Sequence, residues 1–294
     1  MAQTVIDNPV LNSPFEEPSR YFRFADDDIT NDIVEGRRPS GYFLPVPPPK
    51  RRGKQLSLEA EWTQERFRES QWINRVRERV RLWREQGYPG ITNTTEKLLR
   101  HWTDPDREKR LFFCQVEAAE TAIYLTEAAT RLGDAWIEND LRSANERHNP
   151  GLLRVALKMA TGTGKTVTMG MLIAWQALNK LDHPQDSRFS DAFLIVTPNI
   201  TIRDRLRVLL PTDPNNYYRA FDLIPAGVMD RFGQTRVAVV NFHAFLLRDT
   251  SQASRLAKDI LRRRRRGDSL RETPEQMARR VSRDLGGKRN IVVL

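Results

Sequence analysis

The stretch MATGTGKT, residues 159–166, joins two apolar segments of different length. Before it stands LLRVALKM, residues 152–159, and after it TVTMGMLIAWQAL, residues 166–178. The first segment has the length of a buried strand and the second that of a buried helix. Backbone amides in a glycine-containing loop and at a helix N-terminus attract phosphate oxygens. A plain turn between strand and helix is the alternative, but the agreement of strand, loop and helix favours an α/β fold with a phosphate-binding loop.

The loop residues have distinct expected roles. Gly162 and Gly164 allow a tight turn, and Lys165 is expected to reach the β- and γ-phosphates of a nucleotide, which makes it the candidate catalytic residue. The hydroxyl of Thr166 is the candidate Mg²⁺ ligand. The pattern departs from the general one at Met159, where a glycine is usual. The candidate phosphate-binding residues are Thr161, Gly162, Thr163, Gly164, Lys165 and Thr166.

Three further apolar runs follow the loop, at 192–197, 235–240 and 290–294, and helical patterns lie between them. This alternation predicts a parallel sheet covered by helices. Long insertions interrupt the alternation at about 181–191, 211–234 and 249–289.

The N-terminal part of the chain has a different composition. Residues 1–55 mix polar residues with prolines and end in PVPPPKRRGK, which favours a flexible arm or linker. A long amphipathic helix is expected over 56–86, and shorter helices over 95–102 and 113–131. The arginines of the first helix form either a solvated face or a phosphate-contacting one, and the solvated face is the more common case. We therefore expect a helical, partly disordered region up to residue 110, before an α/β domain at 111–294.

Composition narrows the class of protein. The chain has 294 residues, of which 39% are hydrophobic and 29% charged, as in globular proteins. It has no secretion signal and no run near the ~20 apolar residues of a membrane helix, so we expect a cytoplasmic protein without a membrane partner. The single cysteine, Cys114, excludes an intrachain disulfide. The net charge of +10 suits a nucleic-acid partner, and residues 255–289 carry thirteen basic against five acidic residues.

Three motifs in order carry a resemblance to a known family. TGTGKT is followed by TPN at 197–199 and by VVNFHAF at 239–245. This order resembles the first motor domain of superfamily 2 helicases and, more narrowly, the Res subunits of type III restriction enzymes and related DEAD-like restriction helicases. The resemblance covers about residues 111–294. It implies a RecA-like P-loop NTPase domain that uses ATP with Mg²⁺, with double-stranded DNA and a methyltransferase or specificity subunit as partners.

The resemblance also implies roles for residues outside the loop. Gln115 would hydrogen-bond adenine, whose edge an amide can match, although a polar residue that begins a helix is the alternative. Thr197 and Asn199 would hold a DNA backbone phosphate, against the alternative of a helix cap. His243 is expected to be a packed turn residue. The basic run at 262–266, with Arg262, Arg263 and Arg264 as candidate DNA contacts, is equally consistent with a solvated loop.

In proteins that this chain resembles, a strand like NIVVL, 290–294, is followed by Asp-Glu-x-His, whose acids bind Mg²⁺ and activate water. No such pair is present here. We therefore expect a motor domain that is truncated before these acids and lacks ATP turnover, as part of a restriction-system DNA translocase. The alternatives are an inactive nucleotide- and DNA-binding adaptor and another P-loop DNA motor, such as a packaging ATPase. We also expect either a gap in the sheet between 152–159 and 290–294 or a pairing foreign to the family.

Overall fold

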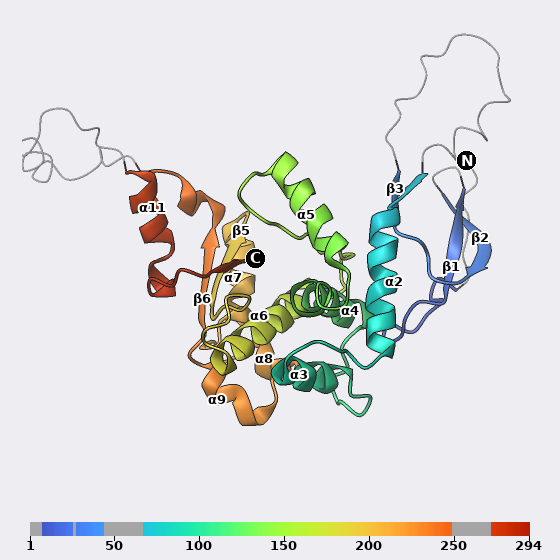
Figure 1. Cartoon of the computed structure of the whole chain (residues 1–294), viewed down its shortest axis with the longest axis horizontal. Helices are drawn as coiled ribbons and strands as arrows, with labels where there is room; N and C mark the ends of the chain where they lie inside the picture. The colour runs from blue at the N-terminus through green and yellow to red at the C-terminus, as the bar shows by residue number, and fades with distance from the viewer. Residues whose placement is uncertain (1–7, 26–27, 44–66, 249–271) are drawn as a thin grey trace, which may run out of the picture. The chain divides into compact units, whose positions relative to one another are not determined.

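A computed structural model describes residues 8–25, 28–43, 67–248 and 272–294 (Figure 1). The chain divides into two compact units. The first consists of residues 1–91 and 103–163, and the second of residues 92–102 and 164–294. The division between Thr163 and Gly164 falls inside the glycine-containing stretch 159–166. No helix in the described ranges combines the length and the apolar character needed to cross a membrane.

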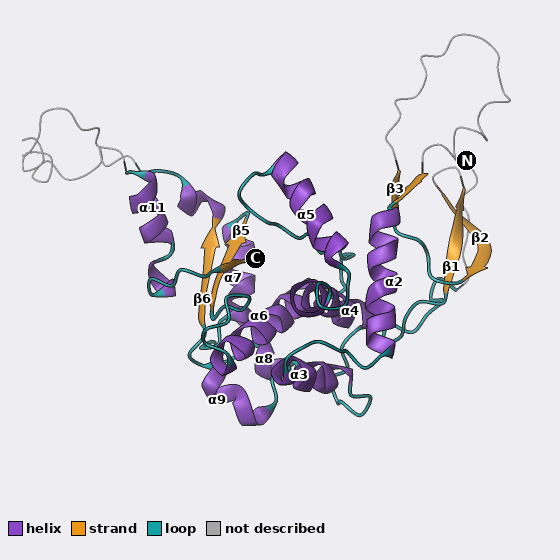
Figure 2. Ribbon diagram, viewed as in Figure 1, coloured by secondary structure: helices purple, strands orange, loops and turns teal. Residues whose placement is uncertain are grey.

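The first unit begins with β-structure, which is visible in orange in Figure 2. Strand β1 (Arg20–Ala25) pairs antiparallel with β2 (Asp28–Glu35), and β3 (Gly41–Phe43) pairs antiparallel with β4 (Phe67–Glu69). The expectation of a flexible arm up to residue 55 is therefore wrong for β1, β2 and β3. Tyr21 lies opposite Val34 and Phe22 opposite Ile33, and such aromatic and β-branched cross-strand pairs stabilise a hairpin.

The described residues of the first unit also contain three α-helices: α2 (Gln71–Glu85), α4 (Phe113–Ile123) and α5 (Ala135–His148). The predicted helix over 56–86 is correct from Gln71 onward, whereas residues 67–69 form β4 and residues 56–66 lie outside the described ranges. The helix expected over 113–131 is α4, which continues as a π-helical turn at Tyr124–Ala128. Helix α2 buries Val76, Val80 and Trp83, whose helical spacing places them on one face.

A buried carboxylate joins two helices of this unit. Glu120 on α4 is fully buried and accepts hydrogen bonds from the Arg84 guanidinium of α2 at 2.7 Å and from the Tyr88 hydroxyl at 2.7 Å. Glu17 adds a second carboxylate 3.5 Å from Arg84. A buried charge needs such partners because its desolvation is otherwise very costly.

The second unit contains a three-stranded parallel sheet in the order β6-β5-β7. The central strand β5 (Ala192–Thr197) pairs with β6 (Arg236–Asn241) on one side and with β7 (Val292–Val293) on the other. The parallel sheet predicted from the apolar runs is confirmed for these three strands. The structure is thus an α/β fold with helices flanking a parallel sheet.

The helices of the second unit are α3 (Asn93–Thr103), α6 (Lys165–Asp182), α7 (Ile200–Arg205), α8 (Tyr217–Ala220), α9 (Met229–Phe232) and α11 (Pro274–Val281). One sheet face is covered by α11 and the 3₁₀ turn Arg283–Leu285, because Val281 and Leu285 pack on Leu194 and Ala238. Helix α6 is almost entirely buried, as its composition predicts. Helices α8 and α9 lie in the insertion expected over 211–234.

The apolar run at 152–159 does not form a strand, so that prediction is wrong. Leu152, Leu153 and Val155 are exposed, and none of these residues pairs with another strand in the described ranges. β-branched and aliphatic residues favour a strand only when a neighbouring strand supplies the hydrogen-bond partners and the packing surface. Because 152–159 is not a strand, neither a gap between two strands nor a pairing foreign to the family is observed; the described sheet consists of β6, β5 and β7.

Candidate phosphate-binding loop

The first half of the loop belongs to the first unit. Gly162 has a φ of +83°, a left-handed backbone conformation that residues other than glycine rarely adopt. The Thr163 hydroxyl donates to the carbonyl of Ala160 at 2.7 Å, which closes a tight turn. The Thr163 carbonyl in turn accepts a hydrogen bond from the side-chain amide of Gln115 at 3.0 Å. The turn is therefore held by both local and distant contacts.

Gln115 uses both ends of its amide within the first unit. Its Nε2 donates to the Thr163 carbonyl, and its Oε1 accepts from the backbone N–H of Phe112 at 3.0 Å. The side chain is 5% exposed. The sequence placed Gln115 at a helix start, which is correct, but it contained no signal for the bond to Thr163. Through these two hydrogen bonds, Gln115 connects the loop to the start of α4.

The second half of the loop is the start of α6. Gly164 caps this 18-residue helix with a φ of +76°, and its carbonyl accepts from the N–H groups of Val167 at 2.8 Å and Thr168 at 3.2 Å. The N–H groups of Gly164 and Thr166 have no acceptor among the described residues. The first turn carries no acidic side chain. The helix therefore presents a positive N-terminus with donors available to an anion.

The loop is accessible from solvent. Thr161, Gly162 and Lys165 are exposed, and Thr163, Gly164 and Thr166 are half-buried. Lys165 is the first residue of α6, so its ammonium group is attached where the helix dipole is most positive. These residues fit a nucleotide polyphosphate: backbone N–H groups and one lysine for the phosphate oxygens, and the Thr166 hydroxyl for a magnesium ion. The described residues contain no cluster of three His, Cys, Asp or Glu side chains that would hold a metal by themselves.

The two residues expected to contact DNA lie at the end of β5. Thr197 is 1% exposed, and its hydroxyl donates to the carbonyls of Asn199 at 3.1 Å and Val240 at 3.2 Å. Asn199 is exposed, and its side chain accepts from the N–H of Ile202 at 2.9 Å as the N-cap of α7. Both side chains thus make the contacts expected of a helix cap or turn, which is the alternative to DNA binding. Of the two, only Asn199 is accessible to solvent.

The motif at the end of β6 forms a short 3₁₀ turn, Phe242–Phe245. Asn241 accepts from the N–H of His243 at 2.9 Å and pairs in register with Thr197 of β5. Its Nδ2 is buried without a hydrogen-bond partner in the described part of the chain. Asn241 is the last residue of β6, and a polar asparagine at the end of an apolar run is the signal in the sequence that could have identified it. His243 is exposed rather than packed. The candidate residues Arg262, Arg263 and Arg264 lie outside the described ranges.

A glycine loop that leads into the N-terminus of a long buried helix, beside a parallel sheet, defines the class of P-loop nucleotide-binding proteins. Residues 108–224 match the family model of the type III restriction enzyme, res subunit. This match confirms, over these residues, the resemblance to the Res subunits of type III restriction enzymes that the motifs indicated. No curated protein and no solved structure matches the chain. The matched segment includes Gln115, the loop and Asn199.

Proposed function

We propose that the chain binds ATP with Mg²⁺ at residues 161–166 and forms the nucleotide- and DNA-binding part of an ATP-dependent DNA translocase of a restriction system. The observation that carries the proposal is the N-terminus of α6, where two backbone donors lack acceptors among the described residues and no acid is present in the first turn. The family match over 108–224 supports the same assignment, since this family uses ATP and interacts with DNA.

In this proposal each loop residue has a separate task. The N–H groups of Gly164 and Thr166 donate to phosphate oxygens, and Lys165 supplies the positive charge that offsets the β- and γ-phosphates. The Thr166 hydroxyl coordinates Mg²⁺. Gly162 and Gly164 have left-handed backbone conformations, which allow the tight turn that this role requires.

The test of the nucleotide site is Lys165→Ala, compared with Lys158→Ala as a matched control. Lys158 is exposed, precedes the loop motif and carries the same charge. A charge-assisted contact to a polyphosphate contributes enough that its loss should weaken ATP binding at least tenfold, as measured by calorimetry with Mg²⁺ present. Lys158→Ala should bind ATP as the parent does. Equal losses in the two variants would mean that the loop does not bind the polyphosphate.

Gln115 has two proposed roles that one experiment separates. The family pattern assigns it to adenine, whereas its contacts to Phe112 and Thr163 use both ends of the amide. A role in adenine recognition requires that a nucleotide replace one of these two backbone partners. Gln115→Ala should then weaken ATP more than GTP. A loss of equal size for both nucleotides would assign Gln115 to loop anchoring alone.

The DNA-binding role is proposed for Asn199 and for the basic run that includes Arg262, Arg263 and Arg264. Neutralising the run should reduce the salt dependence of DNA affinity with little change in sequence preference, because phosphate contacts release counterions. An unchanged slope of log affinity against log salt would mean that the run is a solvated segment. Thr197 is proposed to act by supporting the turn that carries Asn199, since its own hydroxyl is buried.

A further inference from the structure

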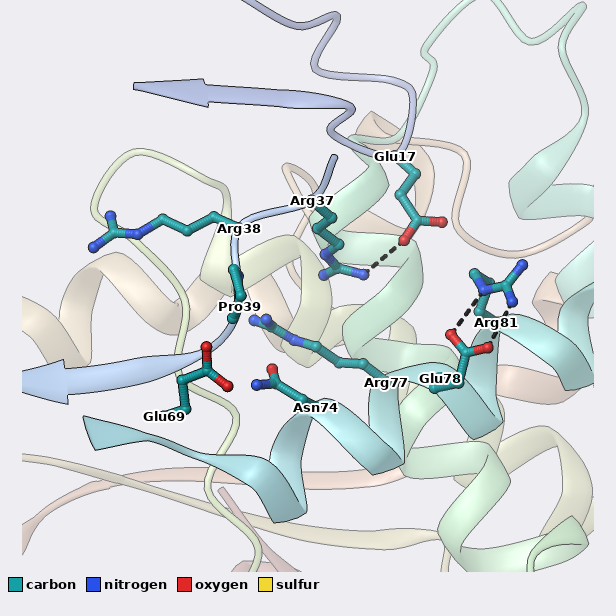
Figure 3. A pocket seen from close by; sticks show the side chains of 9 residues that line it. All are labelled: Glu17, Arg37, Arg38, Pro39, Glu69, Asn74, Arg77, Glu78 and Arg81. Atoms are coloured by element: carbon teal, nitrogen blue, oxygen red, sulfur yellow. Dashed lines mark hydrogen bonds and ion pairs between the residues drawn. The ribbon is translucent and has the colours of Figure 1, made fainter. Parts of the chain in front are cut away.

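A cavity lined by arginines and glutamates lies in the N-terminal part of the first unit, outside the segment that matches the family model. The cavity has a volume of about 360 Å³, and its charged lining residues come from α2, from β4, from the segment between β2 and β3, and from the segment before β1 (Figure 3). They are Arg37, Arg38, Arg77, Arg81, Glu17, Glu69 and Glu78.

Three of the four arginines already have partners. Arg37 binds Glu17 at 3.0 Å and Glu117 at 2.5 Å, and Arg81 binds both Glu78 and Glu85 at 2.6 Å. The Arg38 guanidinium stacks 4.1 Å from the ring centroid of Phe24. The cation–π contact and the ion pairs occupy these side chains, so they form the wall of the cavity.

Arg77 is the exception. It extends from α2 into the cavity, is half-buried, and has neither a hydrogen bond nor an ion pair with any described residue (Figure 3). Burial, followed by the positive charge of Arg37, lowers the pKa of the Arg77 guanidinium, and the negative charges of Glu117 and Glu17 offset part of this effect. A half-buried cation beside a second cation is an unfavourable arrangement that a bound anion would relieve.

The surroundings of Arg77 are fixed by the fold. Asn74, one turn earlier on α2, accepts from the N–H of Ser40 at 2.8 Å and donates to the Ser40 carbonyl at 3.3 Å. These two bonds hold the segment that carries Arg37 and Arg38 against α2. The carboxylates of Glu17 and Glu78 are engaged by arginines, and Glu69 is exposed on β4, where water screens its charge. The cavity therefore has fixed walls and one unused guanidinium.

We propose that this cavity binds a phosphate group through Arg77, as a site separate from the loop at 161–166. A guanidinium presents its donors in a planar fork that matches two phosphate oxygens at once. A water molecule occupies about 30 Å³ of liquid, so the cavity has room for a phosphate group together with the sugar that carries it. The net charge of +10 attracts polyanions to the chain. A nucleic-acid backbone and a free phosphate compound share this chemistry, and the experiment distinguishes them.

The experiment uses the full chain with Lys165→Ala as the parent, so that the result does not depend on the loop. Arg77→Gln and Arg77→Lys are compared with the control Arg75→Gln. Arg75 lies on the same helix, stacks on Trp136 at 4.1 Å and does not line the cavity. The probes are pyrophosphate and a short DNA duplex, with affinities measured by calorimetry and fluorescence anisotropy at one low salt concentration.

Arg77→Gln should raise the dissociation constant about tenfold, Arg77→Lys should raise it less, and Arg75→Gln should leave it within about twofold. If Arg77→Gln loses affinity for the duplex, whether or not it also loses affinity for pyrophosphate, the ligand is a nucleic-acid backbone phosphate. If it loses affinity for pyrophosphate alone, the ligand is a small phosphate compound. Unchanged affinity for both probes, or an equal loss in the Arg75 control, would overturn the proposal.

A thermal measurement separates binding from folding. Without ligand, Arg77→Gln should melt at the parent temperature or above it, because it removes an unpaired, half-buried charge. Pyrophosphate should raise the melting temperature of the parent and not that of Arg77→Gln. A marked decrease in the melting temperature of ligand-free Arg77→Gln would show that Arg77 is a structural residue and would contradict the proposal.

Discussion

The buried carboxylate of Glu120 allows a quantitative test of the first unit. Glu120→Ala would leave the Arg84 guanidinium and the Tyr88 hydroxyl without their shared acceptor. Breaking a buried ion pair by removal of one partner costs about 3–5 kcal/mol. The lower end applies here, because the Arg84 side chain is 22% exposed and keeps Glu17 at 3.5 Å. We expect a loss of about 3 kcal/mol, or roughly 6–12 °C in melting temperature.

The measurement is urea denaturation followed by far-ultraviolet circular dichroism. The matched control is Glu138→Ala, since Glu138 belongs to the same unit and binds Arg142 in an exposed i,i+4 pair with side-chain exposures of 39% and 61%. Such a pair contributes about 0.5 kcal/mol. Glu120→Gln, which keeps an acceptor for Tyr88 but no charge for Arg84, should fall between the two. Equal midpoints for the two alanine variants would refute the assignment of Glu120 as the central contact between α2 and α4.

Three further outcomes are expected in the second unit. The hydrogen bond from Arg188 lowers the pKa of Asp186 from 3.8 to about 2. The stability that this pair contributes is therefore present above pH 4 and is lost as the pH falls towards 2. In an acid titration of unfolding, Asp186→Asn should lack this pH-dependent contribution. Trp102→Phe should cost about 1–3 kcal/mol in denaturant unfolding, because the buried indole donates to the Leu223 carbonyl at 2.8 Å. Gly170→Val should cost about 1–3 kcal/mol in the same assay, since a Cβ there would lie 2.8 Å from the Leu223 side chain.

The features that the sequence predicted are the ones that depend on neighbouring residues. The glycines and lysine of the loop are adjacent in the chain, and the spacing of Val76, Val80 and Trp83 defines one face of α2. Both signals are local, and both correspond to what the structure contains. The parallel sheet was also predictable, because its strands are short apolar runs separated by helices.

The features that were missed have two causes: partners that are distant in the chain, and a local composition that argued against the structure observed. Gln115 and the Thr163 carbonyl are 48 residues apart, and no local pattern links them. The hairpin of β1 and β2 was hidden by the prolines and charges of the longer segment around it, although Tyr21 and Phe22 have strand propensity. The run at 152–159 shows the opposite case, in which strand propensity is present and a pairing partner is absent from the described residues.

The position of β7 in the sheet has a consequence for the order of folding. A hydrogen bond between Thr197 and Val240 links β5 to β6, and these residues are 43 positions apart. The hydrogen bond between Ser190, just before β5, and Asn290, just before β7, joins residues that are 100 positions apart. Each doubling of a closed loop adds only about 0.6 kcal/mol of entropy cost, so the longer closure is thermodynamically tolerable. During synthesis, however, β5 and β6 emerge from the ribosome well before β7. The second edge of β5 therefore stays unpaired until residues 290–294 are made, and this interval is when the nascent chain is most exposed to edge-to-edge association.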